Sequence, residues 1–210
     1  NELKSNKFRR VVQTVSYLPN FISWVLVFTI ANAFLNADTG VLNQILLHMG
    51  LTDAPVPFLT SSDWFYGVAT FLAVWKNSGY WAIIFLAAIS GIDPQLYEAA
   101  EMDGAGRVAR IWYITLPGIK ASVITVLILS IGSLLGGGMG GSNFDQCYIF
   151  GNAINNSASE IIQTFAFKTG LAEGRFAYAT AVDLVQSMLS VTLILISNKI
   201  AKKVTGEGIF

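Results

Sequence analysis

The residue types that most often carry out enzyme chemistry are scarce in this sequence of 210 residues. Cys147 is the only cysteine and His48 the only histidine, so the chain by itself cannot form a disulfide, a Cys/His zinc site or a Cys/His nucleophile pair. It also lacks the GxxxxGK[ST] loop that holds phosphates. We therefore expect no catalytic residue, no metal site and no cofactor in this chain.

Two charged residues stand out because each lies inside a long apolar segment. Lys76 interrupts the aromatic-rich segment 64–91, and Asp183 lies in the segment 176–198. An unpaired ammonium near the middle of a bilayer costs at least ~2.5 kcal/mol, so Lys76 should face protein or water. It could line a polar pathway in which Asn77 and Tyr80 offer hydrogen bonds and stacking, or it could form a structural ion pair with Asp183.

The elements that must position these residues are membrane-spanning helices. Hydrophobic residues make up 53% of the sequence and charged residues 12%, whereas about a quarter of residues are charged in soluble proteins. A bilayer core requires roughly 20 apolar helical residues, and four stretches reach that length: 11–36, 64–91, 119–140 and 176–198. They lack the charged face that helices of a soluble bundle would show. The sequence predicts an all-α integral membrane protein, with one transmembrane domain over 1–210.

The distribution of charge predicts how these helices are oriented. The 13 basic and 13 acidic residues cancel, which argues against nucleic-acid binding. Short cytoplasmic loops retain Lys and Arg, and ten of the basic residues flank the predicted spans on one side: Lys4, Lys7, Arg9, Arg10, Arg107, Arg110, Lys120, Lys199, Lys202 and Lys203. We therefore expect both termini and the loop 92–118 to be cytoplasmic. The start NELKSNKFRR resembles an internal connector and not a leader, so we expect the chain to be incomplete at its N-terminus.

The loop 92–118 is predicted to be a rigid helical hairpin. Asp93 before Pro94 is typical of a helix start, because the carboxylate can accept from free amides and proline suits the first turn. Asp103 and Gly104 predict its end, since glycine readily adopts the left-handed conformation that closes a helix. Small residues on the predicted helix would allow the groove of another protein to approach closely. The alternative is a hairpin that is merely solvated.

The segment LYEAAEMDGAGRVARIWYITLPGI resembles the cytoplasmic signature of binding-protein-dependent ABC importer permeases. The pattern E-A-A, three residues, G, and then I-x-L-P is matched by Glu98, Ala99, Ala100, Gly104, Ile114, Leu116 and Pro117. The flanking Asp93, Pro94, Tyr97, Asp103 and Ala105 resemble the carbohydrate branch of that family. RRVVQTVSYLPNFISW and the ending ISNKIAKKVTGEGIF resemble its subgroup for oligosaccharides and polysaccharide fragments, and the similarity covers nearly all of the chain.

This resemblance implies a multi-pass permease subunit of about six spans in a bacterial plasma membrane, of which this chain would lack the first two. It implies a second permease subunit, cytoplasmic ATP-binding subunits and an extracytoplasmic solute-binding lipoprotein that delivers a sugar. The ATPase-coupling residues would be Glu98, Ala99, Ala100, Asp103, Gly104, Leu116 and Pro117. The candidate substrate pathway would contain Lys76, Asn77, Tyr80 and Asp183.

Three alternatives remain at this stage. The chain could belong to an importer for a non-sugar solute, although the flanks of the signature favour carbohydrate. It could be a membrane anchor or scaffold that does not transport, or a membrane enzyme, although the latter would need more His, Asp or Cys on adjoining spans.

The glycine-rich segment 136–141 could pack helices closely or form an unwound stretch that lines a cavity.

Overall fold

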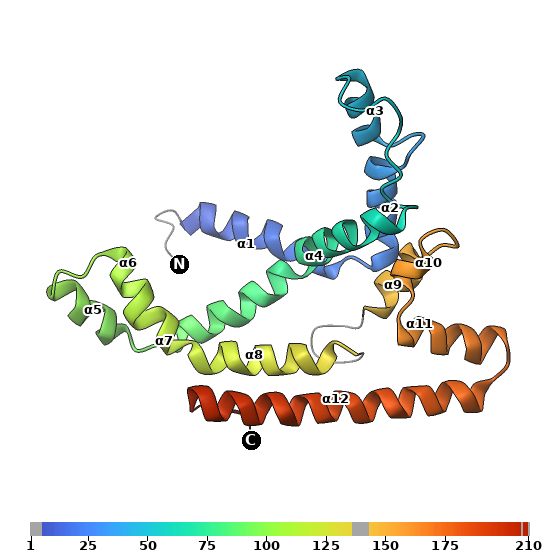
Figure 1. Ribbon diagram of the computed structural model, residues 1–210. Coiled ribbons are helices and arrows are strands. Elements are labelled where there is room, and N and C mark those ends of the chain that lie inside the picture. The colour runs from blue at the N-terminus through green and yellow to red at the C-terminus, as the bar shows by residue number, and fades with distance from the viewer. Residues whose placement is uncertain (1–5, 136–142, 207, 210) are drawn as a thin grey trace. The chain divides into compact units, whose positions relative to one another are not determined.

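The computed structural model describes residues 6–135, 143–206 and 208–209, and every regular element in those ranges is a helix (Figure 1). This confirms the predicted all-α class. The predicted glycine-rich segment 136–141 lies outside the described residues. In chain order the elements are α1 (Asn6–Phe21), α2 (Trp24–Leu35), α3 (Val41–His48), α4 (Ser62–Ser90), α5 (Pro94–Met102), α6 (Arg107–Arg110), a π-helical turn (Ile111–Thr115), α7 (Leu116–Gly118), α8 (Lys120–Ser133), α9 (Phe144–Phe150), α10 (Asn156–Ser159), α11 (Ile162–Phe167), a second π-helical turn (Lys168–Ala172) and α12 (Phe176–Thr205).

The chain divides into two compact units. The first unit contains residues 6–79 and 143–183 of the described chain, and the second contains 80–135, 184–206 and 208–209. Helices α4 and α12 each contribute to both units.

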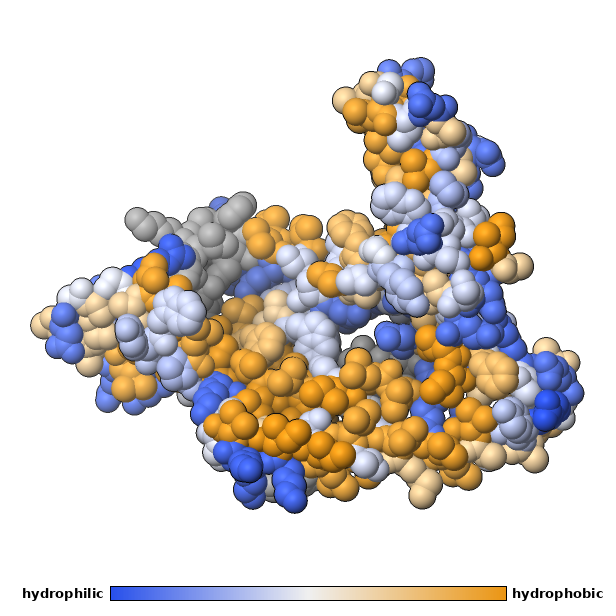
Figure 2. Space-filling model, in the orientation of Figure 1, coloured by the Kyte–Doolittle hydropathy of each residue, from blue (hydrophilic) through white to orange (hydrophobic). Residues whose placement is uncertain are grey.

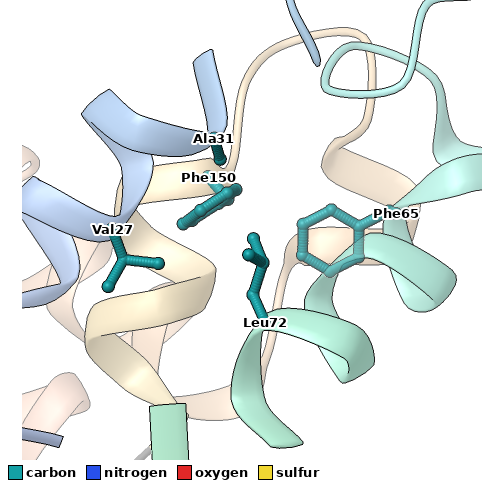
Figure 3. Packing of buried hydrophobic residues seen from close by; sticks show 5 residues of the cluster. All are labelled: Val27, Ala31, Phe65, Leu72 and Phe150. Atoms are coloured by element: carbon teal, nitrogen blue, oxygen red, sulfur yellow. The ribbon is translucent and has the colours of Figure 1, made fainter. Parts of the chain in front are cut away.

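The hydrophobic core of the first unit lies between α2, α4 and α9. Val27 and Ala31 from α2, Phe65 and Leu72 from α4, and Phe150 from α9 form one buried cluster (Figure 3). The ring of Phe150 meets Phe28 edge to face at 5.0 Å between centroids, an arrangement that aromatic quadrupoles favour. Three segments that are distant in sequence therefore share one apolar centre.

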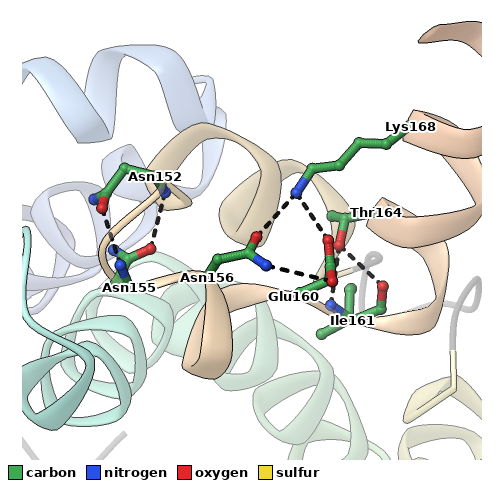
Figure 4. Close-up of polar contacts among 7 residues, drawn as sticks. All are labelled: Asn152, Asn155, Asn156, Glu160, Ile161, Thr164 and Lys168. Carbon is green, nitrogen blue, oxygen red and sulfur yellow. Dashed lines mark hydrogen bonds and ion pairs between the residues drawn. The ribbon is translucent and has the colours of Figure 1, made fainter. Parts of the chain in front are cut away.

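Buried asparagine and threonine side chains join the loops of the first unit. Asn43, which is 1% exposed, donates to the carbonyls of Asn36 and Val56 at 3.0 Å each and accepts from Val56 N at 2.8 Å. Asn155, which is fully buried, donates to the carbonyls of Leu59 and Phe150 and accepts from Asn152 N at 2.8 Å. Figure 4 shows the last of these bonds beside the neighbouring contacts of Glu160, Thr164 and Lys168. Because buried amide groups are costly to leave unpaired, these contacts fix the loops 36–62 and 150–168.

The predicted span 11–36 is not one straight helix. Helices α1 and α2 meet at Ile22 and Ser23 with a bend of 104°. Pro19 lies within α1 and lacks an amide hydrogen for the helical ladder, and the Ser23 side chain caps α2 by accepting from Leu26 N at 3.3 Å. Pro19 and the Ser23 cap thus divide the apolar segment 11–36, which hydropathy alone predicts as one span, into two helices.

Two helices, Ser62–Ser90 and Phe176–Thr205, are individually long and apolar enough to cross a membrane. The bent pair α1 and α2, and a second pair bent by 58° at Ile119, would raise the count among described residues to four if each pair is one span. The four-span arrangement therefore stays a prediction, as do its boundaries.

In the second unit, α8 approaches α12 at Gly132 and at Lys120. Gly132 contacts the side chain of Ile194, and a methyl group at this glycine would overlap that side chain, so a small residue is needed where the helices meet. Lys120 Nζ donates to the Thr205 carbonyl at the end of α12 at 2.7 Å. Large apolar side chains cover much of the exposed surface of α12 (Figure 2), which is the surface expected to face lipid.

Candidate functional site

The strongest candidate site is the helical hairpin of the second unit, formed by residues 92–119. Its first helix, α5, begins as predicted: the Asp93 carboxylate accepts from Gln95 N at 2.9 Å, and Pro94 occupies the first helical position. The helix ends at Asp103, and Gly104 has a positive φ of 76°. A side chain at position 104 would meet no neighbouring atom. The glycine is therefore required by its backbone conformation, not by lack of space.

Side-chain contacts hold α5 against the second arm of the hairpin. The hydroxyls of Tyr97 and Thr115 lie 2.9 Å apart, and Arg110 donates to Glu101 at 3.0 Å in an exposed ion pair. At the base, the absence of a side chain at Gly118 allows Ile92 to pack against its backbone. Leu116 and Pro117, two of the predicted coupling residues, lie in α7 just before the bend at Ile119. Pro117 sits within this short helix, and the direction changes two residues later.

The hairpin presents an apolar surface with an acidic group beside it. No residue of α5 is buried, and Ala99 and Glu98 are both exposed. Within the described part of the chain, the Glu98 carboxylate makes no hydrogen bond or ion pair. Large side chains of both arms are largely exposed: Leu96 at 53%, Met102 at 88%, Trp112 at 65% and Tyr113 at 82%. Exposed apolar clusters with a polar rim are typical of protein-binding surfaces.

Lys76, the basic residue predicted to lie inside a span, caps the C-terminal end of α1. Its side chain is 7% exposed, and Nζ donates to the carbonyl of Asn20 at 2.9 Å and lies 5.7 Å from the centroid of the Trp24 ring. Asn20 is in the last turn of α1, where carbonyls lack helical partners and the helix dipole favours a cation. The ammonium is thus stabilised by the end of α1 and by an aromatic face.

Sequence reasoning missed how closely α4 approaches α1 one turn after Lys76. A methyl group at Gly79 would overlap the Ser16 carbonyl and lie 2.7 Å from Tyr17 Cα. The signal for this crossing was the glycine at position 79, because small residues are common at tight contacts between membrane helices. Gly79 and Lys76 together hold α4 against the last turns of α1.

The other residues predicted for the pathway do not all belong to the same unit. Asn77 is half-buried in the first unit and Asp183 is exposed near its end. Tyr80 belongs to the second unit, where its ring meets Trp81 at 5.4 Å. A pathway containing these residues, or a pair between Lys76 and Asp183, remains a prediction. Across 6–135, 143–206 and 208–209, no group of three or more His, Cys, Asp or Glu residues could hold a metal ion.

The bent apolar helices and the exposed hairpin are features of a transport protein's membrane subunit, and comparison with known proteins identifies the family. The chain belongs to the family described as binding-protein-dependent transport system inner membrane component, whose model matches residues 1–204. This confirms the resemblance to binding-protein-dependent permeases found in the sequence. Members of this family are membrane components of transport systems and are not themselves enzymes.

Two curated relatives are similar over the whole chain. Over 210 residues the chain is 41% identical to protein LplB and 39% identical to the polygalacturonan/rhamnogalacturonan transport system permease protein YteP, both of Bacillus subtilis (strain 168). It covers 64% and 63% of these relatives' lengths. The crystal structure of a bacterial alginate ABC transporter, in complex with a periplasmic protein bound to alginate pentasaccharide, contains a chain with a TM-score of 0.89 and 33% identity. That match covers 99% of this chain and 70% of the other.

Proposed function

We propose that this chain is part of the permease subunit of an ATP-driven ABC importer, and that it forms the transmembrane pathway for an oligosaccharide or polysaccharide fragment. The observation that carries the proposal is the exposed hairpin: Glu98 and Ala99 of the signature are exposed, Ala100 is half-buried, and the Glu98 carboxylate has no partner in the described chain. The similarity to YteP and to a chain of the alginate transporter supports carbohydrate as the cargo.

The hairpin would transmit ATP hydrolysis to the membrane helices by docking in a cleft of a cytoplasmic ATP-binding subunit. The exposed apolar side chains and Ala99 would enter that cleft, while Glu98 would form a charge-assisted contact with the partner. Gly104 and Asp103 would set the direction of the helix, and Leu116 with Pro117 would relay its movement to α8 across the bend at Ile119. A second permease subunit and an extracytoplasmic solute-binding lipoprotein would complete the transporter.

Transport and hydrolysis by the complete transporter, reconstituted with its binding protein, test this function. We expect import of a labelled oligosaccharide that depends on ATP and on the binding protein. Glu98→Gln should lower uptake about tenfold or more, because a hydrogen bond to a charged group contributes ~1.5–3 kcal/mol. Glu101→Gln is the matched control, since Glu101 pairs within the hairpin, and it should leave uptake nearly unchanged. Normal uptake by the Glu98 variant would remove the coupling role, and ATP-dependent uptake restricted to non-sugar solutes would overturn the cargo.

The orientation that this function requires places both termini and the hairpin in the cytoplasm. Burial raises the pKa of the Cys147 thiol, and replacing it by alanine gives a background free of cysteine. In that background, Ser157→Cys should react with an impermeant thiol reagent from outside the cell, whereas Gly106→Cys should react only after the membrane is opened. Both positions are exposed, so a difference reports sidedness. Labelling of position 106 from outside would invert the orientation.

Lys76, Asn77, Tyr80 and Asp183 are proposed to contribute to the sugar pathway. The capping contact of Lys76 with α1 supports a structural role instead, in which Lys76→Met lowers the yield of the complex whether or not Asp183 is changed. A double-mutant cycle separates that role from a pathway role and from a pair between Lys76 and Asp183. If Lys76 acts in the pathway, Lys76→Met should alter sugar uptake while the complex still assembles, with no rescue by Asp183→Asn. If the two residues pair, each single variant should lower the yield of the complex and the double variant should restore it.

A further inference from the structure

A small polar cavity lies in the first unit, apart from the residues proposed for the pathway. Its volume is about 230 Å³. It is bordered by the end of α2 with the turn that follows, the loop before α4, and the end of α9, and it opens to the surface at Asp38 and Thr60. The side chains that decide its chemistry are Phe28, Asn32, Asp38, Thr60, Phe150 and Asn152.

Some polar groups of this cavity are already used to build it. Asn36 donates to Asn32 Oδ1 at 3.1 Å, and its own Oδ1 accepts from the amides of Asp38 and Thr39. Asn152 donates to the Leu59 carbonyl at 3.2 Å and accepts from Ile154 N and Asn155 N. The wall of the cavity is therefore held by bonds within the first unit, and its shape does not depend on a ligand.

Other polar groups of the cavity are unused. In the part of the chain that the structure describes, the Asn32 amide nitrogen, the Asp38 carboxylate and the Thr60 hydroxyl have no hydrogen-bond partner; Asp38 and Thr60 are exposed and Asn32 is half-buried, so all three are open to a ligand that enters from the surface. They provide donors from Asn32, strong acceptors from Asp38 and a hydroxyl that does both. This mixture fits a ligand that carries several hydroxyl groups, each of which donates and accepts.

The remaining wall is apolar and partly aromatic. Phe28 and Phe150 pack edge to face, and Pro57, Leu59 and Ile149 also line the cavity. A ligand with an apolar ring face and polar edges would satisfy both kinds of wall. Ligand sites commonly combine apolar surface with a few placed polar groups in this way.

The volume and the charge of the cavity restrict the size and the charge of a ligand that could bind there. The cavity is smaller than the roughly 300–1,000 Å³ of typical small-molecule sites and equals roughly seven or eight waters of liquid volume, which suits one sugar ring and not an oligosaccharide. Asp38 is the charged residue among its lining side chains, which include no Lys, Arg or His. A carboxylate on the ligand would be repelled by Asp38, whereas neutral hydroxyls would bind it.

We propose that this cavity is a binding site for a single neutral pyranose ring, with Asn32 and Asp38 as its hydrogen-bonding groups. The inference rests on the proposed sugar-import function and deepens it. Under the proposed orientation the site lies at the extracytoplasmic end of the first unit, where a sugar leaving a binding protein would arrive. It would favour a neutral terminal ring over a uronic acid.

The test measures binding of simple glycosides to the complete transporter in lipid nanodiscs, without binding protein, by saturation-transfer NMR. The probes are the methyl glycosides of glucose, galactose and rhamnose, with methyl galacturonide as the acidic comparison. We expect at least one neutral glycoside to bind saturably and the galacturonide to bind about fivefold more weakly or less. Asp38→Ala and Asn32→Leu should each weaken the neutral glycoside about fivefold or more, since each removes a hydrogen bond.

Matched variants keep this test decisive. Asp53→Ala removes an exposed carboxylate from the same loop region without touching the cavity and should leave binding unchanged. Ala37→Phe should abolish binding by filling the cavity while sparing its polar groups, because Ala37 lines the wall.

Three results would overturn the site: no neutral glycoside binds, the galacturonide binds as well as the neutral glycosides, or Asp38→Ala weakens docking of the binding protein while glycoside binding is unchanged. The last would assign the cavity to the binding protein. If the transporter imports an oligosaccharide normally but binds no glycoside here, the site alone fails. If it imports no sugar with its binding protein present, the proposed function fails.

Discussion

The loops of the first unit bury their polar side chains and pair them within the chain, whereas the hairpin of the second unit leaves polar side chains exposed. In the first unit, Asn43, Asn155 and Thr164 are at most 1% exposed, and each has its hydrogen bonds within the chain. In the hairpin, α5 has no buried residue, and Glu98 and Ala99 face outward. The first unit therefore fixes its own conformation, whereas the hairpin offers groups that another chain must satisfy.

This contrast predicts where substitutions act. A buried polar group left without its partner costs ~1–3 kcal/mol, whereas an exposed ion pair contributes ~0–1 kcal/mol. Changes in the first unit should therefore lower stability, and changes in the hairpin should leave stability nearly constant. Single substitutions in the two units test that division.

Asn155→Ala should produce the largest loss. It removes the donor to Phe150 O and the acceptor for Asn152 N in a fully buried position, and stranding both groups should cost roughly 2–5 kcal/mol of unfolding free energy. Denaturant unfolding of the purified protein in detergent measures this. Asn156→Ala is the matched control, because Asn156 bonds exposed Glu160 and Lys168, and it should cost less than ~1 kcal/mol. Equal losses would show that burial of the asparagine network is not what stabilises the first unit.

Gly79→Ala should follow, because a methyl group there would overlap the backbone of α1. Forcing the helices apart should cost ~1–3 kcal/mol and lower the melting temperature of the protein in detergent. Gly67→Ala lies in the same helix with no atom within 4 Å of the new methyl. It should be neutral or stabilising by up to ~1 kcal/mol through helix propensity. A tolerated Gly79→Ala would contradict the close crossing of α1 and α4.

Lys76→Met and Lys120→Met compare two lysines that cap helix ends. Lys76 binds the Asn20 carbonyl in a buried position, and Lys120 binds the Thr205 carbonyl while exposed. Loss of the buried contact should cost ~1–3 kcal/mol because the Asn20 carbonyl keeps no substitute partner. Loss of the exposed contact should cost less than ~1 kcal/mol, since water replaces it. Melting temperatures of the two variants, measured under the same conditions, test this difference. An equal drop in melting temperature would contradict the stronger contribution predicted for the buried contact of Lys76.

Glu101→Gln should have the smallest effect on stability. Its ion pair with Arg110 is largely exposed, with 71% of the Glu101 side chain accessible, so its loss should cost less than ~0.5 kcal/mol. Unfolding in detergent at low and high salt measures it. A loss above ~1 kcal/mol would mean that the hairpin depends on its internal contacts as the first unit does.

The start and the end of α5 could be predicted from sequence, because their signals are local. Asp93 and Pro94 specify the start of α5 and Gly104 its end, and these residues lie within a dozen positions of one another. The membrane-spanning helices α4 and α12 also follow from hydropathy, which depends on composition over about 20 residues.

The interior of the first unit could not be predicted in the same way. Gln146 donates to the Ala69 carbonyl and Asn155 to the Leu59 carbonyl, contacts separated by 77 and 96 residues. An asparagine or glutamine has the same appearance in a sequence whether it is solvated or bonded to a distant loop. The bend at Ile22 was missed for a different reason: averaging hydropathy over the segment hides Pro19 and Ser23, which carry the signal.

The contact between Lys76 and Asn20 also bears on how the chain is made. The two residues are separated by 56 positions, and at about 5–20 residues per second the ribosome needs roughly 3–11 s to pass from one to the other. During that interval the end of α1 has emerged without its cap, and the sharp turn into α2 has no lysine to hold it. The capping contact that holds the bend can therefore form only after Lys76 has been synthesised, so it lags behind translation of α1 and α2.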